Sequence, residues 1–247
     1  MTQFLKYSLF TLALAVFSFS LFVGQARADV VSVACSGTSG SPTAVTEADL
    51  AGDDVTFTDG GDGWCVLDEA ISASSVVINT GVTITHTATD VDGVTITTTG
   101  IFEIQEGGVI NADTKGCQGV ANADGTGPDG SNVCGPQAGW GDGNGSDGGY
   151  QGAGYGGLGG MGSSSTFILG GATYGSATAP IFLGSSGGGV AGASLNAGGD
   201  GGGLVILSIG GIFTHNGTIY LYHSQLFGGF NRNFFGKRWK WYGSYHC

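Results

Sequence analysis

The sequence predicts an all-β fold, a right-handed parallel β-helix with a glycine-rich loop insert. The run Gly-Val-Thr-Ile-Thr occurs at residues 81–85 and again at 93–97, and similar short runs follow at 100–104 and 204–209. These runs are rich in β-branched residues and are separated by Gly, Asn and Asp, which is typical of short strands. Such short strands cannot bury a face alone, but stacked turns of a solenoid bury them together. The alternative is a sandwich or meander, which would give longer strands spaced about 8–12 residues apart.

The first 28 residues are predicted to be a secretory signal peptide. Lys6 supplies the positive charge, and an apolar run follows from about residue 7 to residue 23. Ala26-Arg27-Ala28 fits a cleavage site, which would make Asp29 the first residue of the mature chain. A transmembrane anchor is the alternative, but no basic stop-transfer cluster closes the run. No later segment reaches the roughly 18 apolar residues that a membrane span requires, so none is expected in the mature chain.

After the signal peptide, the composition divides the chain into five segments. They are an N-terminal cap (29–75), first solenoid coils (76–115), a glycine-rich insert (116–203), last solenoid coils (204–226) and an aberrant basic-aromatic tail (227–247). Disorder is the simplest interpretation of the insert, because flexible linkers have such a composition. Its Tyr, Leu, Met, Phe and Ile residues instead favour a compact, loop-rich excursion, since solvated linkers contain few of these.

The charge distribution excludes several classes of function. The chain holds 19 acidic and 7 basic residues, and Lys115 is the only basic residue between Asp29 and Phe230. Nucleic acid is therefore not an expected partner, because binding to phosphates requires many lysines and arginines. Chemistry that depends on an active-site arginine is excluded from this body as well. An acidic, lysine-poor chain suits solubility outside the cell or the binding of divalent cations.

Five cysteines follow the signal peptide. In an oxidising compartment, four of them can pair in three ways. The sequential pairing Cys35–Cys65 and Cys117–Cys134 is favoured because each pair encloses a local loop rich in Gly and Asp. Cys247 is left over at the last position, where it could link two chains or have no designed role.

Part of the insert resembles a group of known proteins. The stretch from Tyr174 to Gly189 contains Tyr-Gly, Pro and Leu-Gly-Ser-Ser-Gly-Gly-Gly, and the stretch 198–207 reads Gly-Gly-Asp-Gly-Gly-Gly-Leu-Val-Ile-Leu. With Gly217-Thr-Ile219, these resemble the glycine-rich segment of large secreted bacterial β-helix and adhesin-like surface proteins. The match covers about 45 residues. The resemblance implies a parallel β-helix in a secreted or cell-surface setting, and it assigns no catalytic residue.

The tail differs from the body in composition. It contains Arg232, Lys237, Arg238 and Lys240 among several aromatic residues. The codons of Trp239-Lys-Trp-Tyr242, read one base later with Gly243 supplying the last base, encode Gly, then Asn or Ser, then Gly, then Met or Thr, a composition closer to that of the body. A frameshift near residues 219–230 would therefore explain the tail, and the domain would be truncated at its C-terminus. The alternative is an evolved basic-aromatic arm that binds a membrane or a polyanion.

The sequence predicts no cofactor, and calcium is the one that it leaves open. Asp142, Asn144, Ser146 and Asp147 place hard oxygen donors at nearly alternate positions, as in calcium loops. Weaker copies of the pattern occur at Asp59 with Asp62 and at Asp124 with Asp129. The alternative is ordinary Asx-turn chemistry, in which these side chains bind only their own backbone.

No catalytic residue is predicted. Pectate-lyase-like and polygalacturonase-like solenoids are the obvious enzymes to compare with this architecture. The lyase type typically requires a basic residue together with calcium-binding carboxylates, and the hydrolase type requires clustered aspartates. Asp90 and Asp92 are separated by one residue and lie in a stretch whose composition predicts a turn, so this pair is not expected to be catalytic. His86, His215 and His223 occur singly and lack the spacing of metal ligands, so each is expected to face solvent or to be satisfied in the core.

Three functional hypotheses follow. The first is a secreted or cell-surface structural or adhesive module without catalytic activity, which presents a solenoid face to carbohydrate or to a cell-surface partner. The second is a polysaccharide lyase or glycoside hydrolase of β-helix type, active or inactive. The third is a non-functional fragment of a larger surface protein.

Overall fold

The computed structural model describes residues 29–50, 54–121, 123–129, 131–135, 154, 171–175, 181–189 and 197–221. In this part of the chain the regular structure consists of β-strands and one 3-10 helix, so the predicted all-β fold is confirmed. The elements are β1 (Val30–Cys35), β2 (Thr43–Val45), η1 (Glu47–Asp49), β3 (Asp54–Asp59), β4 (Trp64–Leu67), β5 (Ile71–Ala73), β6 (Ser75–Ile78), β7 (Thr83–Thr85), β8 (Val94–Thr98), β9 (Phe102–Ile104), β10 (Val109–Asn111), β11 (Gly127–Pro128), β12 (Cys134–Gly135), β13 (Val205–Ile209), β14 (Phe213–His215) and β15 (Thr218–Tyr220).

Three parallel sheets carry the core. Sheet 1 has the strand order β1-β3-β6-β9-β14, sheet 2 has β15-β10-β7-β4-β2, and sheet 3 has β13-β8-β5. Every pairing within these sheets is parallel. The short β11–β12 pair in the glycine-rich insert is antiparallel.

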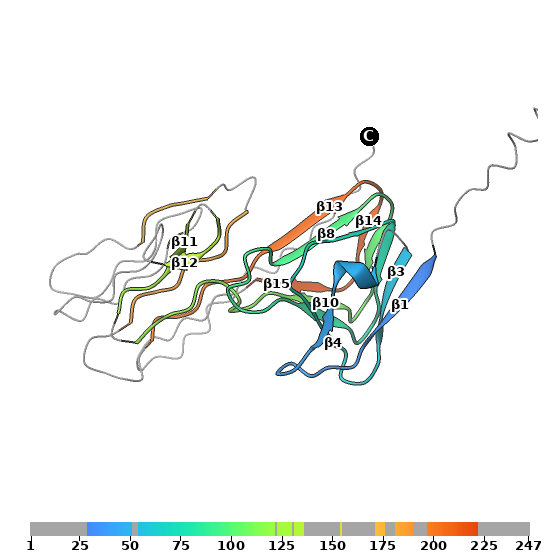
Figure 1. Cartoon of the computed structure of the whole chain (residues 1–247), viewed down its shortest axis with the longest axis horizontal. Coiled ribbons are helices and arrows are strands. Elements are labelled where there is room, and N and C mark those ends of the chain that lie inside the picture. Colours follow the sequence, from blue (N-terminus) through green and yellow to red (C-terminus); the bar gives the residue numbers. More distant parts are fainter. Residues whose placement is uncertain are drawn as a thin grey trace, which may run out of the picture.

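The chain visits the three sheets in a fixed cyclic order. From β3 onward it passes from sheet 1 to sheet 2 to sheet 3 and back, and we call one such pass a round (Figure 1). The first round is β1 and β2, with η1 where a sheet 3 strand would stand, and the last is β14 and β15. This order is compatible with the predicted β-helix. It also places β1 and β3, from the segment predicted as a cap, in the same sheet as later strands.

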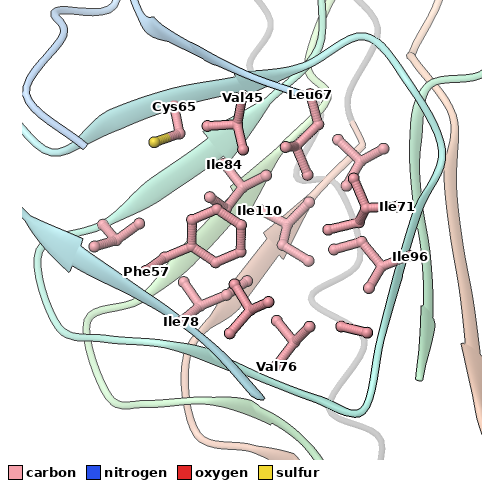
Figure 2. Close-up of a cluster of buried hydrophobic side chains, with 14 of the residues drawn as sticks. Val45, Phe57, Cys65, Leu67, Ile71, Val76, Ile78, Ile84, Ile96 and Ile110 are labelled. Atoms are coloured by element: carbon pink, nitrogen blue, oxygen red, sulfur yellow. The ribbon is translucent and has the colours of Figure 1, made fainter. Parts of the chain in front are cut away.

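Alternation of inward and outward residues explains why these segments form strands. The register aligns inward residues of sheet 1 into columns, one of which runs Val31, Val55, Val76, Phe102 and Phe213. Figure 2 shows branched and aromatic side chains from the sheets pointing toward one another in the enclosed space. Phe57, Ile84 and Ile96 are fully buried there. Burying each such side chain contributes about 1.5–3 kcal/mol, which stabilises strands too short to fold alone.

Both predicted disulfides are present. Cys35–Cys65 joins β1 to β4 across a sequence separation of 30 residues, and both of its cysteines are buried. Cys117–Cys134 spans 17 residues inside the glycine-rich insert and joins its first described stretch to β12. Each bridge stabilises the fold mainly because it restricts the conformations open to the unfolded chain.

The glycine-rich insert leaves the sheets after β10 and returns at β13. Its described parts are extended stretches that run side by side to one side of the sheets (Figure 1). Backbone hydrogen bonds connect them: the Cys117 amide donates to the Gly184 carbonyl (2.9 Å), and the Gly184 amide donates to Gly202 (2.8 Å). Backbone hydrogen bonds therefore hold the described parts of the insert against one another.

Glycines spaced three residues apart allow this packing. The pairs are Gly116 with Gly119, Gly184 with Gly187, and Gly198 with Gly201. A Cβ at Gly119 would lie 1.9 Å from the Gly198 carbonyl oxygen, and one at Gly198 would lie 1.8 Å from that of Gly187. At Gly116, Gly119, Gly184, Gly198 and Gly201, a Cβ would lie less than 3.0 Å from a neighbouring backbone atom, so only glycine fits there.

Several predicted features lie outside the described residues. They are the signal peptide to Ala28, the apolar residues of the insert from Tyr150 to Leu169, His223, and the tail from residue 227 with Cys247. The predictions for these segments stand as made.

Candidate functional site

The most unusual side-chain environment lies where the glycine-rich insert joins the sheets. Asp68 follows β4, His86 follows β7 and Lys115 follows β10 by a few residues, and these three strands are neighbours in sheet 2. Parallel neighbours end at the same edge of a sheet, so their following residues gather there. The returning chain reaches this place at Gly203 and Leu204, just before β13.

His86 is fully buried in this junction. Its Nδ1 lies 2.8 Å from the Thr87 carbonyl oxygen and therefore carries a proton that it donates to that oxygen. Its Nε2 then accepts from the Leu204 amide, at 3.4 Å. Gly203 is required here because a Cβ at that position would lie 2.2 Å from His86 Nε2. The ring therefore ties the end of β7 to the returning end of the insert.

Burial lowers the pKa of His86 to about 4. The hydrogen bond to Thr87 and the charge of Asp68 act in the opposite direction, while the positive charge of Lys115 lowers the pKa further. A buried imidazole without a charged partner is stable only in its neutral form. At neutral pH, His86 is therefore an uncharged hydrogen-bonding group in the core, which is one of the two environments that the sequence predicts for it.

Two carboxylates at this junction have different environments. Asp68 is exposed and accepts hydrogen bonds from the Thr87 amide (2.7 Å) and the Thr87 hydroxyl (2.6 Å). Asp90 has one carboxyl oxygen, Oδ2, that is buried without a partner in the described part of the chain. Burial and then the nearby charge of Asp68 raise the pKa of Asp90 to about 6. An acid with a raised pKa near a second carboxylate is an arrangement that acid–base chemistry uses.

Asn132 connects the loop that contains Asp90 to the described parts of the insert through hydrogen bonds. The sequence provided little reason to select this residue. Its side-chain amide donates to the carbonyls of Val91 (3.0 Å) and Ile181 (2.8 Å), and its Oδ1 accepts from the Leu183 amide (2.8 Å). The residue is buried and has a positive φ of 64°. Asparagine tolerates that conformation better than most residues, which, with its three bonds, explains its place at this turn. Its place between the paired cysteines Cys117 and Cys134 was the only signal that the sequence offered.

Replacing Asp90 by asparagine is expected to stabilise the fold at pH 7 and to have little effect at pH 4. The pKa of Asp90 is raised to about 6 from an ordinary 3.8, so its ionisation destabilises the folded state as pH rises through 6. Asparagine removes that charge at every pH. Urea unfolding at pH 4, 5, 6 and 7 measures the difference, with Asp62→Asn, an exposed turn residue, as the matched control. A stability loss in D90N at pH 7 would contradict the prediction.

The predicted calcium ligands Asp142, Asn144, Ser146 and Asp147 lie outside the described residues. No group of three or more His, Cys, Asp or Glu residues that could hold a metal ion occurs within the described ranges. In each of the two weaker copies, one aspartate accepts hydrogen bonds from nearby backbone: Asp59 accepts from the Gly61 amide (2.9 Å), and Asp129 accepts from the amides of Ser131 (2.7 Å) and Val133 (3.0 Å). These contacts are typical of Asx turns.

Asp90 and Asp92, the pair considered for catalysis, lie in the turn that the sequence predicts. Thr89 there has a φ of 63°, and its amide donates to the Lys115 carbonyl (2.8 Å). Among the neighbouring carboxylates, Asp68 raises the pKa of Asp90 more than Asp92 does. The sequence did not suggest that Asp68 lies near Asp90. His215 is half-buried on the last strand of sheet 1, far along the chain from this junction, and burial lowers its pKa.

Comparison with known proteins finds no match. No protein-family model, no curated protein and no solved structure matches this chain. Among the described residues, no helix is long and apolar enough to cross a membrane.

Proposed function

We propose that this chain is a secreted or cell-surface structural or adhesive module without catalytic activity. Its scaffold would be a right-handed parallel β-helix, and one outer face of that scaffold would bind carbohydrate or a cell-surface partner. The cyclic order of the three parallel sheets supports the scaffold, because a chain that repeats one path stacks its rounds. The two disulfides support an oxidising compartment such as the cell exterior.

A column of exposed hydroxyl groups on sheet 3 carries the binding proposal. Ser72, Thr97 and Ser208 are aligned by the register of β5, β8 and β13, and all three are exposed. Neighbouring strands lie about 4.8 Å apart, so the hydroxyl groups repeat at that spacing. Each hydroxyl can both donate and accept a hydrogen bond. Such a regular row suits a polymer whose polar groups also repeat, and a polysaccharide is the partner of that kind.

The test is binding of the mature chain, residues 29–247, to a panel of neutral and acidic polysaccharides by affinity electrophoresis. The variant Thr97→Ala with Ser208→Ala removes two of the three hydroxyls and is expected to weaken binding about tenfold, since each lost hydrogen bond contributes about 0.5–1.5 kcal/mol. The matched control is Thr56→Ala with Thr214→Ala, which removes two hydroxyls from sheet 1. Retention of no polymer, or equal effects of the two double variants, would contradict the proposal.

A second candidate function is polysaccharide hydrolysis or lysis at the insert junction. Asp90, with a raised pKa, could act as the acid, and Asp68 as the base or nucleophile. Incubation with pectin- and alginate-like polymers, followed by assays for reducing ends and for unsaturated products, tests this function. Product formation that is lost in both Asp90→Asn and Asp68→Asn would replace the non-enzymatic proposal. No product from any polymer would remove the enzymatic candidate.

A further inference from the structure

The strands of sheet 3 carry no charged residue. They read Ile-Ser-Ala in β5, Val-Thr-Ile-Thr-Thr in β8 and Val-Ile-Leu-Ser-Ile in β13. Figure 1 shows β8 and β13 side by side at the outer rim of the sheets. The hydroxyl column of Ser72, Thr97 and Ser208 is exposed there. A ligand on this face therefore meets hydroxyl and apolar groups but no ionic partner from the strands.

The base of the insert closes one side of the hydroxyl column. The outward pair next to it, toward the start of the strands, is Thr95 with Ile206. Ile206 is half-buried because it packs against the cluster that contains Leu183 and Leu204. The open part of the face is therefore a strip along the column, which crosses the strands, and we call it the open strip. A strip of this shape suits a linear chain better than a flat surface.

Apolar side chains border the other side of the open strip. Thr99 follows β8 and is exposed, and Ile101 lies just beyond it with 47% of its side chain exposed. Ile212, 66% exposed, occupies the same position in the next round, since its carbonyl accepts from the Phe102 amide (2.9 Å). A sugar ring has hydroxyl groups around its edge and C–H groups on its faces. The open strip and its border offer partners for both.

The charged residues nearest to the open strip are mostly acidic. Asp68 and Glu69 precede β5, Asp92 precedes β8, and all three are exposed. η1 adds a further acid, because the Glu47 amide donates to Oε2 of Glu69 at 3.5 Å. Lys115, in the junction with the insert, is the single basic residue of the body. An anionic polymer on the open strip would face like charges, which is unfavourable, whereas a neutral polymer would not.

The spacing of the hydroxyl groups selects the shape of the polymer. Neighbouring strands lie about 4.8 Å apart, so the column repeats at that distance. An extended chain of β-linked pyranose rings advances by one ring over a similar length, whereas a flexible, coiling chain keeps no such repeat in line. We infer that the open strip binds a neutral, extended polysaccharide that lies across the strands with its hydroxyl groups on Ser72, Thr97 and Ser208. This inference rests on the proposed function and specifies its polymer.

Two derivatives of one β-linked glucose chain isolate the effect of charge. Hydroxyethylcellulose is neutral, and carboxymethylcellulose is anionic on the same backbone. Affinity electrophoresis of the mature chain, residues 29–247, is expected to show retention by the neutral derivative that salt does not change. Retention by the anionic derivative is expected to be about tenfold or more weaker at low salt and to increase at high salt, where like charges are screened. Dextran, a neutral coiling polymer, is the control for shape and is expected to retain nothing.

Paired charge removal tests whether the acids beside the open strip cause this selection. Glu69→Gln with Asp92→Asn is expected to raise retention by carboxymethylcellulose, relative to hydroxyethylcellulose, by about threefold at low salt. The matched control is Asp62→Asn with Glu106→Gln, which removes the same charge from exposed turns between sheets 1 and 2. The control is expected to leave the ratio unchanged. An equal change in both pairs would assign the selection to the net charge of the chain and overturn the inference.

The failure of this inference can be distinguished from failure of the proposed function. Equal retention by the two derivatives at low salt, or retention of the anionic one that appears only with calcium and disappears with EDTA, overturns the inference alone. Retention by no polymer, or equal effects of the two hydroxyl double variants, removes the proposed function and the inference together. Dimers that form without polymer and are abolished by Thr97→Glu would identify a second copy as the occupant and overturn the inference. All proteins carry Cys247→Ser, and far-UV circular dichroism confirms that each variant is folded.

Discussion

Replacing Gly201 by alanine is expected to unfold the glycine-rich insert while the three sheets remain folded. A Cβ at Gly201 would lie 2.0 Å from the Gly184 carbonyl oxygen, a backbone atom that cannot rotate away. The stretches must then separate, which breaks the bond from the Gly201 amide to Cys117 (2.8 Å) and the one from the Gly116 amide to Gly201 (2.9 Å). Overpacking of a well-packed site costs about 1–3 kcal/mol or more, which exceeds what a segment with few apolar contacts can lose.

Hydrogen exchange measured by mass spectrometry separates the two parts of the molecule. Peptides covering 113–121 and 181–189 are expected to lose protection in Gly201→Ala, while peptides covering β3, β6 and β9 keep it. Gly40→Ala is the matched control, because a Cβ at Gly40 meets nothing within 4 Å. Unchanged protection of the insert in G201A would show that its stretches do not depend on close backbone approach.

Acidification from pH 6.5 to pH 4 is expected to destabilise the fold through His86. The pKa of His86 is lowered from 6.5 to about 4 in the folded state, so the unfolded chain takes up a proton first as pH falls. Stability is therefore lost progressively as pH falls from 6.5 toward 4, and the loss amounts to about 3 kcal/mol for a shift of this size. A protonated Nε2 could no longer accept a hydrogen bond from the Leu204 amide. Protonation therefore weakens the contact between the end of β7 and the returning end of the insert.

Asp90 acts in the opposite direction over nearly the same range. Its raised pKa means that acidification below pH 6 removes a destabilising charge, which offsets part of the effect of His86. The measurement is therefore best made in Asp90→Asn, with urea unfolding at several pH values. Adding His86→Gln, which can still accept from the Leu204 amide but does not titrate, is expected to remove the larger part of the acid dependence and to leave the part that comes from His215, whose pKa burial also lowers. An equal pH slope in the single and double variants would contradict the assignment to His86.

The sequence predicts the strands because their signal is local. The two Gly-Val-Thr-Ile-Thr runs correspond to β7 and β8, and the run after Gly100 corresponds to β9. Alternation of branched and polar residues over a few positions is sufficient for that prediction. The disulfide pairs could also be predicted from the sequence, because each pair closes a short loop. The number of sheets and the place of each strand in them could not be predicted, because they depend on contacts between rounds.

The junction could not be predicted for the same reason. The Leu204 amide and the His86 ring are separated by 118 positions, and no motif connects them. Asp68 and Asp90 follow different strands, and only the parallel arrangement of β4 and β7 brings them together. The three-residue spacing of Gly116 and Gly119 is visible in the sequence, but the surrounding excess of glycine hides it.

The position of the insert within a single round has a consequence for folding. Each strand of the last rounds pairs with one made much earlier: Val205 pairs with Val94, and Phe213 pairs with Phe102. Such non-local pairings slow folding, because a long loop must close before they form. During synthesis, β1 to β10 can assemble as they emerge, whereas β13 to β15 must wait for the intervening residues. The final edge should therefore be the last part to form and the first to open, and shortening the intervening loop should speed refolding.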